Sequence, residues 1–180
     1  MSFTVAVIGA RGRLGQVVCR VVESMPDAQL VATLGSADDQ AAAYAADVVV
    51  DVTSHVVSPG IVAAAIGAGR RVLIGTSGWS AERIQTVRTQ VAANPGTGVV
   101  VIPNFSLGSV LATGFAAIAA KHFEAAEIIE AHHDGKVDSP SGTAVRTAEL
   151  MLASRGDLGP LASPFVDQRA RGQQVASIPV

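Results

Sequence analysis

The sequence contains little cysteine, few aromatic residues and no excess of either charge. Its single cysteine, Cys19, excludes an internal disulfide and points to a reducing cytoplasm. The formal net charge of −2 argues against a general attraction to nucleic acid or to an anionic membrane. Glycine, proline or charge interrupts each apolar run before the ~20 residues of a membrane span. No basic stretch precedes a hydrophobic one at the start, so we expect no signal peptide.

Small apolar side chains are abundant instead, in segments that alternate between strand and helix patterns. The composition, 49% hydrophobic but only 4% aromatic, suits parallel strands that pack closely against helices. Strands are predicted over 3–8, 30–34, 48–52, 72–74 and 99–102, and helices over 14–22, 41–46, 61–68 and 81–92. This alternation predicts βαβ units, a parallel sheet and right-handed crossovers.

The pattern changes near residue 104. Helices are predicted over 110–123 and 141–154, a strand over 126–131 and the start of another within 175–180. We therefore predict an α/β fold with a Rossmann-like dinucleotide-binding domain over 1–106. An α+β substrate-binding and oligomerisation domain follows over 107–180. This second region is too short for a sheet layer with its own core, so we expect it to be truncated and to need more chain or a partner subunit.

A glycine-rich segment joins the first strand to the first helix. Gly9, Gly12 and Gly15 allow a tight turn, close approach of the backbone to a pyrophosphate, and close helix packing. The helix start then supplies N–H donors and a positive dipole end. The spacing is G-x-x-G-x-x-G rather than G-x-G-x-x-G, so an ordinary strand-to-helix turn stays open as the alternative. No G-K-[ST] follows, which argues against a nucleoside-triphosphate loop.

Two arginines in this loop bear on the choice of cofactor. Arg11 and Arg13 are either solvated surface residues or partners for the 2′-phosphate of NADPH. An acid at the end of the second strand would favour NADH instead, but the first acids after Gly35 are Asp38 and Asp39. The sequence therefore favours NADPH and leaves NADH open.

Chemically versatile residues gather in the segment 130–144, EAHHDGKVDSPSGTA. On a strand, His132 and His133 would point to opposite faces, so they are poor joint ligands and no metal is expected. Lys136 follows across a glycine, and an ammonium group beside an imidazole suits proton donation near neutral pH. Ser141 is a good helix N-cap, and the N–H groups of the first turn suit a substrate carboxylate. The alternative, a polar loop and a simple cap, stays open.

The segment HHDGKVDSPSGTA resembles the signature H-H-x-x-K-x-D-A-P-S-G-T-A of dihydrodipicolinate reductases. Three more segments are similar to that family in order and context: the loop 9–15, the stretch GTSGW at 75–79 and the stretch IPNFS at 102–106. The departures are mild: Ser139 replaces alanine, Ser77 replaces threonine, Trp79 replaces phenylalanine and Val52 replaces phenylalanine. The family's chains continue beyond I-P-V, which is a second reason to expect truncation.

The resemblance implies a homotetrameric cytoplasmic enzyme that reduces the cyclic dicarboxylate 4-hydroxy-tetrahydrodipicolinate with NADPH or NADH in lysine and diaminopimelate biosynthesis. It implies proton transfer by His132 and Lys136. Substrate contacts are implied at His133, Gly142 and Thr143, beside the predicted cap Ser141. The implied cofactor-binding residues are Gly9, Ala10, Arg11, Gly12, Arg13, Leu14, Gly75, Thr76, Ser77, Ile102, Pro103, Asn104 and Phe105.

Other enzyme classes fit the sequence less well. A short-chain dehydrogenase needs a Tyr-x-x-x-Lys pair, but Val48 stands four residues after the only tyrosine, Tyr44. Cys19 lies among valines and is a poor candidate for the nucleophile of a semialdehyde dehydrogenase. A non-catalytic nucleotide-sensing Rossmann protein remains the alternative. Asp51 and Thr53, after the third strand, are either ribose contacts or part of a strand-end turn.

Overall fold

The computed structural model describes residues 2–102, 104–135, 139–160 and 174–180. The chain divides into two compact units, Met1–Pro103 and Asn104–Val180. Each unit has buried apolar clusters of its own. The domain boundary predicted after residue 106 lies close to this division.

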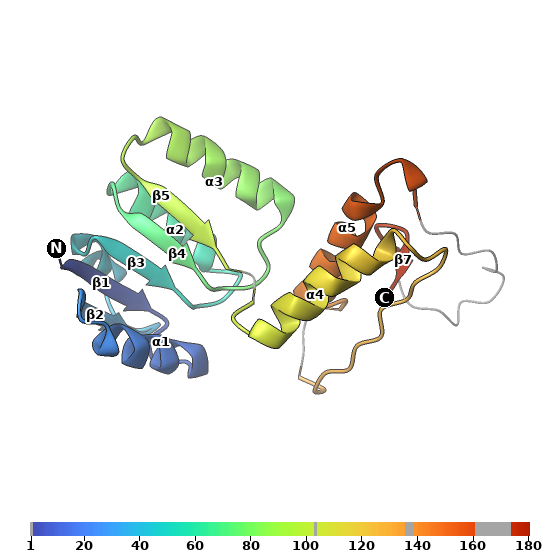
Figure 1. The fold of residues 1–180 in the computed structure, drawn as a ribbon. Helices are drawn as coiled ribbons and strands as arrows, with labels where there is room; N and C mark the ends of the chain where they lie inside the picture. Colours follow the sequence, from blue (N-terminus) through green and yellow to red (C-terminus); the bar gives the residue numbers. More distant parts are fainter. Residues whose placement is uncertain (1, 103, 136–138, 161–173) are drawn as a thin grey trace. The chain divides into compact units, whose positions relative to one another are not determined.

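The first unit is built on a parallel sheet of five strands in the order β2-β1-β3-β4-β5 (Figure 1). Its strands are β1 (Phe3–Ile8), β2 (Ala28–Leu34), β3 (Val48–Asp51), β4 (Arg71–Ile74) and β5 (Gly98–Val101). The central strands are runs of valine and isoleucine, the composition expected of strands that are covered on both faces. The structure confirms the predicted parallel sheet.

Helices cover both faces of this sheet: α1 (Arg13–Ser24) on one, and the 3-10 helix η1 (Gln40–Ala45), α2 (Ser58–Gly67) and α3 (Ala81–Ala93) on the other. On the α1 face, Val22 packs with Val7 and its neighbours in the sheet. On the opposite face, Ile66 of α2 and Val87 of α3 pack with Ile74. Right-handed crossovers place the helices in this way, because the chain moves from β1 to β2 in one direction and from β3 to β5 in the other.

The strand order creates a switch point between β1 and β3. The connection from β1 leads to β2 at one edge of the sheet, and the connection from β3 leads to β4, toward the other edge. In open parallel sheets, ligands bind outside the carboxyl ends of the strands at such a point. The loops that follow β1 and β3 are therefore the expected binding region of the first unit.

The second unit consists mainly of two helices, α4 (Leu107–Ala120) and α5 (Gly142–Arg155), which pack against each other. The short helix η2 (Gly156–Leu158) follows α5. Arg155 is buried at the end of α5, and its Nη1 donates hydrogen bonds to the carbonyl oxygens of Ala120 at 2.6 Å and Phe123 at 2.7 Å. This guanidinium group therefore supplies a donor to the last carbonyl group of α4, which has no partner within its own helix, and to one in the segment that follows.

One strand prediction in this unit is wrong, and the other is confirmed in part. The segment 126–131 is not a strand; among the described residues its backbone bonds once outside itself, from Ile128 N–H to the oxygen of Pro179 at 2.9 Å. The strand predicted to begin within 175–180 is present as two short strands, β6 (Gln174–Val175) and β7 (Ile178–Pro179), which form a hairpin. Ala176 and Ser177 join them with φ of 49° and 64°. Positive φ at both positions reverses the chain tightly. No helix in the described parts of the chain is both long enough and apolar enough to cross a membrane.

Candidate functional site

The loop after β1 packs closely against the loop after β3. Gly9 has φ of 91°, and a Cβ atom there would lie 2.4 Å from the backbone oxygen of Val52. At Gly15, the first buried position of α1, a Cβ atom would lie 2.1 Å from the oxygen of Gly9. The N–H groups of Gly9 and Ala10 donate to Leu34 O at 2.8 and 3.0 Å. Only glycine fits at positions 9 and 15, so this backbone is held at the switch point by close packing.

The start of α1 differs from the starts of α3 and α4. Ser80 and Ser106 cap those two helices, each by accepting a backbone N–H with its side chain. The N-cap of α1 is Gly12, which has no side chain and makes no such bond. The N–H groups of this first turn are therefore left for an anion, as in other dinucleotide-binding loops.

A buried carboxylate organises the neighbouring loops. Asp51 is 0% exposed and accepts hydrogen bonds from the hydroxyl of Thr53 at 2.6 Å and that of Thr76 at 3.0 Å. The hydroxyl of Ser58, at the start of α2, also donates to it. Trp79 Nε1 donates in turn to Ser58 Oγ at 3.2 Å. Asp51 thus joins the ends of β3 and β4 to α2, which supports the strand-end turn over a ribose contact.

Two of the three predicted cofactor segments meet at the carboxyl ends of β1, β3 and β4. The backbone N–H of Gly75 donates to Asp51 O at 2.8 Å, which places the loop after β4 beside the loop after β3. Within these two segments, Ala10 and Thr76 are buried, Leu14 is half-buried, and Arg11, Arg13 and Ser77 are exposed. The first unit therefore brings the two segments to one edge of its sheet.

The third predicted cofactor segment spans the division between the units. Ile102 continues from β5, with its N–H donating to Ile74 O at 2.8 Å, and Phe105 is 47% exposed in the second unit. Pro103 lies outside the described residues. The side chain of Asn104 donates to Ser109 Oγ at 2.8 Å and to Thr143 Oγ1 at 3.3 Å. A residue predicted to bind the cofactor thus contacts one predicted to bind substrate.

The predicted catalytic segment is organised by a carboxylate that the sequence analysis missed. Ser141 N–H donates to Glu130 Oε1 at 2.7 Å, and the Ser141 hydroxyl donates to Glu130 Oε2. The same Oε2 lies 3.8 Å from His132 Nδ1. Ser141 Oγ also accepts the N–H of Ala144 at 3.1 Å and so caps α5 as predicted. Glu130 therefore links one imidazole to the start of the helix. The only sequence signal was its place at the head of the histidine motif.

Of the remaining predicted site residues, His133, Gly142 and Thr143 lie within the described part of the chain and Lys136 does not. The ring of His133 lies against Gly135, where a Cβ atom would be 3.4 Å from His133 Nδ1. Gly142 and Thr143 are exposed in the first turn of α5, and a Cβ atom at Gly142 would meet nothing within 4 Å. Lys136 lies outside the described residues, so its predicted role as a proton donor stays a prediction.

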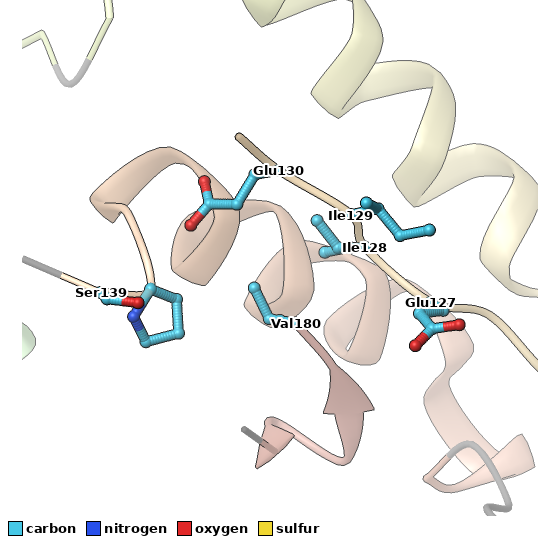
Figure 2. Close-up of a pocket in the computed structure, with 7 residues that line it drawn as sticks. Glu127, Ile128, Ile129, Glu130, Ser139 and Val180 are labelled. Atoms are coloured by element: carbon cyan, nitrogen blue, oxygen red, sulfur yellow. The ribbon is translucent and has the colours of Figure 1, made fainter. Parts of the chain in front are cut away.

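A cavity of about 260 Å³ lies beside this segment. Figure 2 shows the residues around it, with Glu127 and Glu130 both among them. The carboxylate of Glu130 is directed to the start of α5, consistent with its bonds to Ser141. Two carboxylates make this cavity a poor site for a dicarboxylate, because like charges repel. The exposed first turn of α5 is the better candidate.

Metal and thiol chemistry find little support in the described residues. No group of three or more histidine, cysteine, aspartate or glutamate side chains gathers there in a way that could hold a metal ion. Cys19 is half-buried in α1, and burial raises the pKa of its thiol. A raised pKa lowers the fraction of the reactive thiolate at neutral pH.

Comparison with known families gives matches over nearly the whole chain. The profile described as "Dihydrodipicolinate reductase, N-terminus" matches residues 3–105. The profile described as "Dihydrodipicolinate reductase, C-terminus" matches residues 108–179. The two matches follow each other in the order of the two units.

Individual relatives agree with this result. A protein named 4-hydroxy-tetrahydrodipicolinate reductase from Clavibacter sepedonicus is 54% identical over 180 residues, which cover 100% of this chain and 65% of that protein. A protein of the same name from Streptomyces coelicolor is 41% identical over 98% of this chain and 73% of its own length. The dipicolinate-bound dihydrodipicolinate reductase from Paenisporosarcina sp. TG-14 superposes with a TM-score of 0.72 at 29% identity, over 99% of this chain and 77% of that one. The chain thus spans about two thirds of the length of the Clavibacter relative.

Proposed function

Because the chain belongs to the dihydrodipicolinate reductase family, we propose that it reduces 4-hydroxy-tetrahydrodipicolinate to tetrahydrodipicolinate with NADPH or NADH, in the pathway to diaminopimelate and lysine. The observation that carries this proposal is the start of α5, where His132 lies beside Glu130 and close in sequence to the exposed turn of Gly142 and Thr143. An imidazole and an exposed helix start together suit a reaction that needs both a proton and a bound carboxylate. A nucleotide sensor needs neither.

The first unit fits a nicotinamide dinucleotide at the switch point of its sheet. The backbone from Gly9 to Gly12 and the start of α1 would hold the pyrophosphate. The loops after β3 and β4 would hold the nicotinamide half, positioned by Asp51 through Thr76. When bound, the cofactor supplies a hydride.

The second unit would bind the cyclic dicarboxylate and supply its proton. Loss of the substrate hydroxyl as water produces a conjugated imine, and hydride addition at its far carbon drives electrons toward the ring nitrogen. A proton must then reach that side of the ring. With Nδ1 of His132 directed to Glu130, Nε2 is the nitrogen left to transfer it. Lys136 is proposed as the second proton donor. The first turn of α5, at Gly142 and Thr143, would take a substrate carboxylate, with His133 as a further contact.

Two wider properties are part of the proposal. The single cysteine and the biosynthetic role of the family support a cytoplasmic location. Assembly as a homotetramer is proposed from the family resemblance. Separation by size with light scattering tests it directly, since a monomer or dimer would contradict it.

The catalytic proposal is tested by replacing the proposed proton donors. We expect His132→Ala or Lys136→Ala to lower kcat by roughly 10²–10⁴-fold, the usual effect of losing a general acid. The affinity for reduced nicotinamide cofactor should barely change, because neither residue belongs to the three proposed cofactor segments. His122→Ala is the matched control, since His122 is an exposed imidazole after α4 that is not part of the proposed site.

The assay follows oxidation of the reduced cofactor in the presence of 4-hydroxy-tetrahydrodipicolinate. A kcat within a few-fold of the parent chain for both variants would exclude these roles. Binding of the cofactor without any turnover by the parent chain would favour the nucleotide sensor instead. A kcat lost equally in His122→Ala would show a general effect on folding.

A further inference from the structure

At the carboxyl end of β2, an arginine of the glycine loop forms an ion pair with an aspartate of the next turn. Arg11 Nη2 donates to both carboxylate oxygens of Asp38, at 3.2 Å from Oδ1 and 2.9 Å from Oδ2. Asp38 Oδ2 also accepts the N–H of Gly35 at 2.7 Å. The two side chains are 70% and 30% exposed, so the pair borders on solvent.

Glycine at position 35 leaves room for the Arg11 side chain in this arrangement. A Cβ atom on Gly35 would lie 3.1 Å from both Cδ and Nε of Arg11, closer than ordinary contact. The backbone N–H of Asp38 donates to Gly35 O at 3.3 Å, which closes the turn. The turn therefore folds Asp38 back to the end of β2, although two residues separate it from Gly35 in the sequence.

This is the place where dinucleotide-binding folds distinguish the two nicotinamide cofactors. An acid at the end of the second strand binds the ribose 2′-hydroxyl of NAD, whereas a nearby arginine accommodates the 2′-phosphate of NADP. Here an acid and an arginine are both present, and they bind each other. The sequence-based preference for NADPH depended on having no acid at this strand end, but the fold supplies one from Asp38.

We propose that Asp38 determines the cofactor preference of this chain and that the preference is for NADH. This inference depends on the proposed function, because it requires a nicotinamide dinucleotide at the switch point. The 2′-hydroxyl of NADH donates to Asp38 while Arg11 stays paired. The 2′-phosphate of NADPH has to take Arg11 from Asp38 and then lie beside a carboxylate of like charge, which weakens binding.

The experiment is a calorimetric titration of the full chain with NADH and with NADPH, at low salt where charge effects are largest. We expect NADH to bind more tightly to the parent chain. Asp38→Asn keeps an oxygen for the N–H of Gly35 but removes the charge. It should lower the ratio of the NADPH to the NADH dissociation constant by about tenfold. Adding Arg11→Ala to Asp38→Asn should remove that gain, because the freed guanidinium group is what binds the phosphate.

Asp39→Asn is the matched control. Asp39 is adjacent in sequence and has the same charge, but its carboxylate accepts the N–H of Ala41 at 3.0 Å as the N-cap of η1. The cofactor ratio should stay within twofold of the parent value in this variant. An equal change in both variants would attribute the effect to net charge and overturn the assignment of Asp38.

The outcomes separate this inference from the proposed function. Tighter binding of NADPH by the parent chain, or an unchanged ratio in Asp38→Asn, overturns the inference alone. Failure of the parent chain to bind either dinucleotide overturns both.

Discussion

The buried carboxylate of Asp51 is expected to be a main source of stability at the proposed cofactor edge. Asp51→Ala leaves several donors without their acceptor. The N–H of Thr53 retains Thr76 Oγ1 at 2.9 Å, and the Thr76 hydroxyl retains the Asp51 backbone oxygen at 3.4 Å. The hydroxyls of Thr53 and Ser58 lose an acceptor that no other described bond replaces. A stranded buried donor costs about 1–3 kcal/mol, so we expect a loss of about 3 kcal/mol in the free energy of unfolding.

Two further variants divide this loss into its parts. Asp51→Asn keeps the volume and one acceptor oxygen, so it should cost about half as much as alanine. Trp79→Phe removes the bond to Ser58 Oγ and part of a ring that packs against the core, so we expect at least about 1 kcal/mol. The exposed Asp27→Asn is the control, and its effect should stay within about 0.5 kcal/mol.

Urea unfolding followed by tryptophan fluorescence measures these differences for the first unit, because Trp79 is the only tryptophan of the chain. The Trp79→Phe variant is followed by circular dichroism instead. Asp51→Ala should also weaken dinucleotide binding, since Thr76 and Trp79 belong to the loop after β4. A cost below about 1 kcal/mol for Asp51→Ala, or one no larger than that of Asp27→Asn, would refute it.

Two more predictions concern a helix cap and acid stability. Ser141→Ala should lower the free energy of unfolding of the second unit by about 1 kcal/mol through loss of the α5 cap, measured by thermal melts; an unchanged melting temperature would contradict the capping role. The N–H and hydroxyl of Thr4 hold the pKa of Asp47 below its ordinary value of 3.8, so this stabilisation is complete above that value and is lost as the pH falls through the lower folded-state pKa. Thr4→Val should therefore make stability, measured by urea unfolding, less dependent on pH in the acid range, and an unchanged dependence would argue against it.

The parallel sheet could be predicted because each of its strands has a recognisable local sequence pattern. Valine and isoleucine runs bounded by glycine or charge are enough to define β1, β3 and β4, and the helices between them then fix the direction of each crossover. The glycine turn was also predictable, because Gly9 and Gly15 are required by backbone contacts that no other residue permits. These features depend on short-range patterns and on topology rules.

The second unit was less predictable because its patterns fit more than one structure. The apolar segment 126–131 has the composition of a strand, but a strand also needs partners that supply backbone hydrogen bonds. Within the part of the chain that the structure describes, Ile128 alone has such a partner, at Pro179. Within 175–180, no residue type predicts the turn, since neither Ala176 nor Ser177 is a typical residue for positive φ. Local propensity therefore predicts β structure here without predicting which residues pair.

The polar contacts at the candidate site were hardest to predict, and the same physical reason applies to each of them. Glu130 reaches Ser141 across eleven residues, and Asp38 reaches Arg11 across twenty-seven. Neither pair lies within one helix or one strand, so periodicity carries no signal for these pairs. Each depends on how a turn closes, at Gly35 in one case and at the start of α5 in the other. The sequence therefore predicts which kinds of ligand a charged loop side chain can bind. Which ligand it prefers depends on the residue with which it pairs in the fold. An unpaired Arg11 would favour a phosphate, whereas an Arg11 paired with Asp38 favours a hydroxyl.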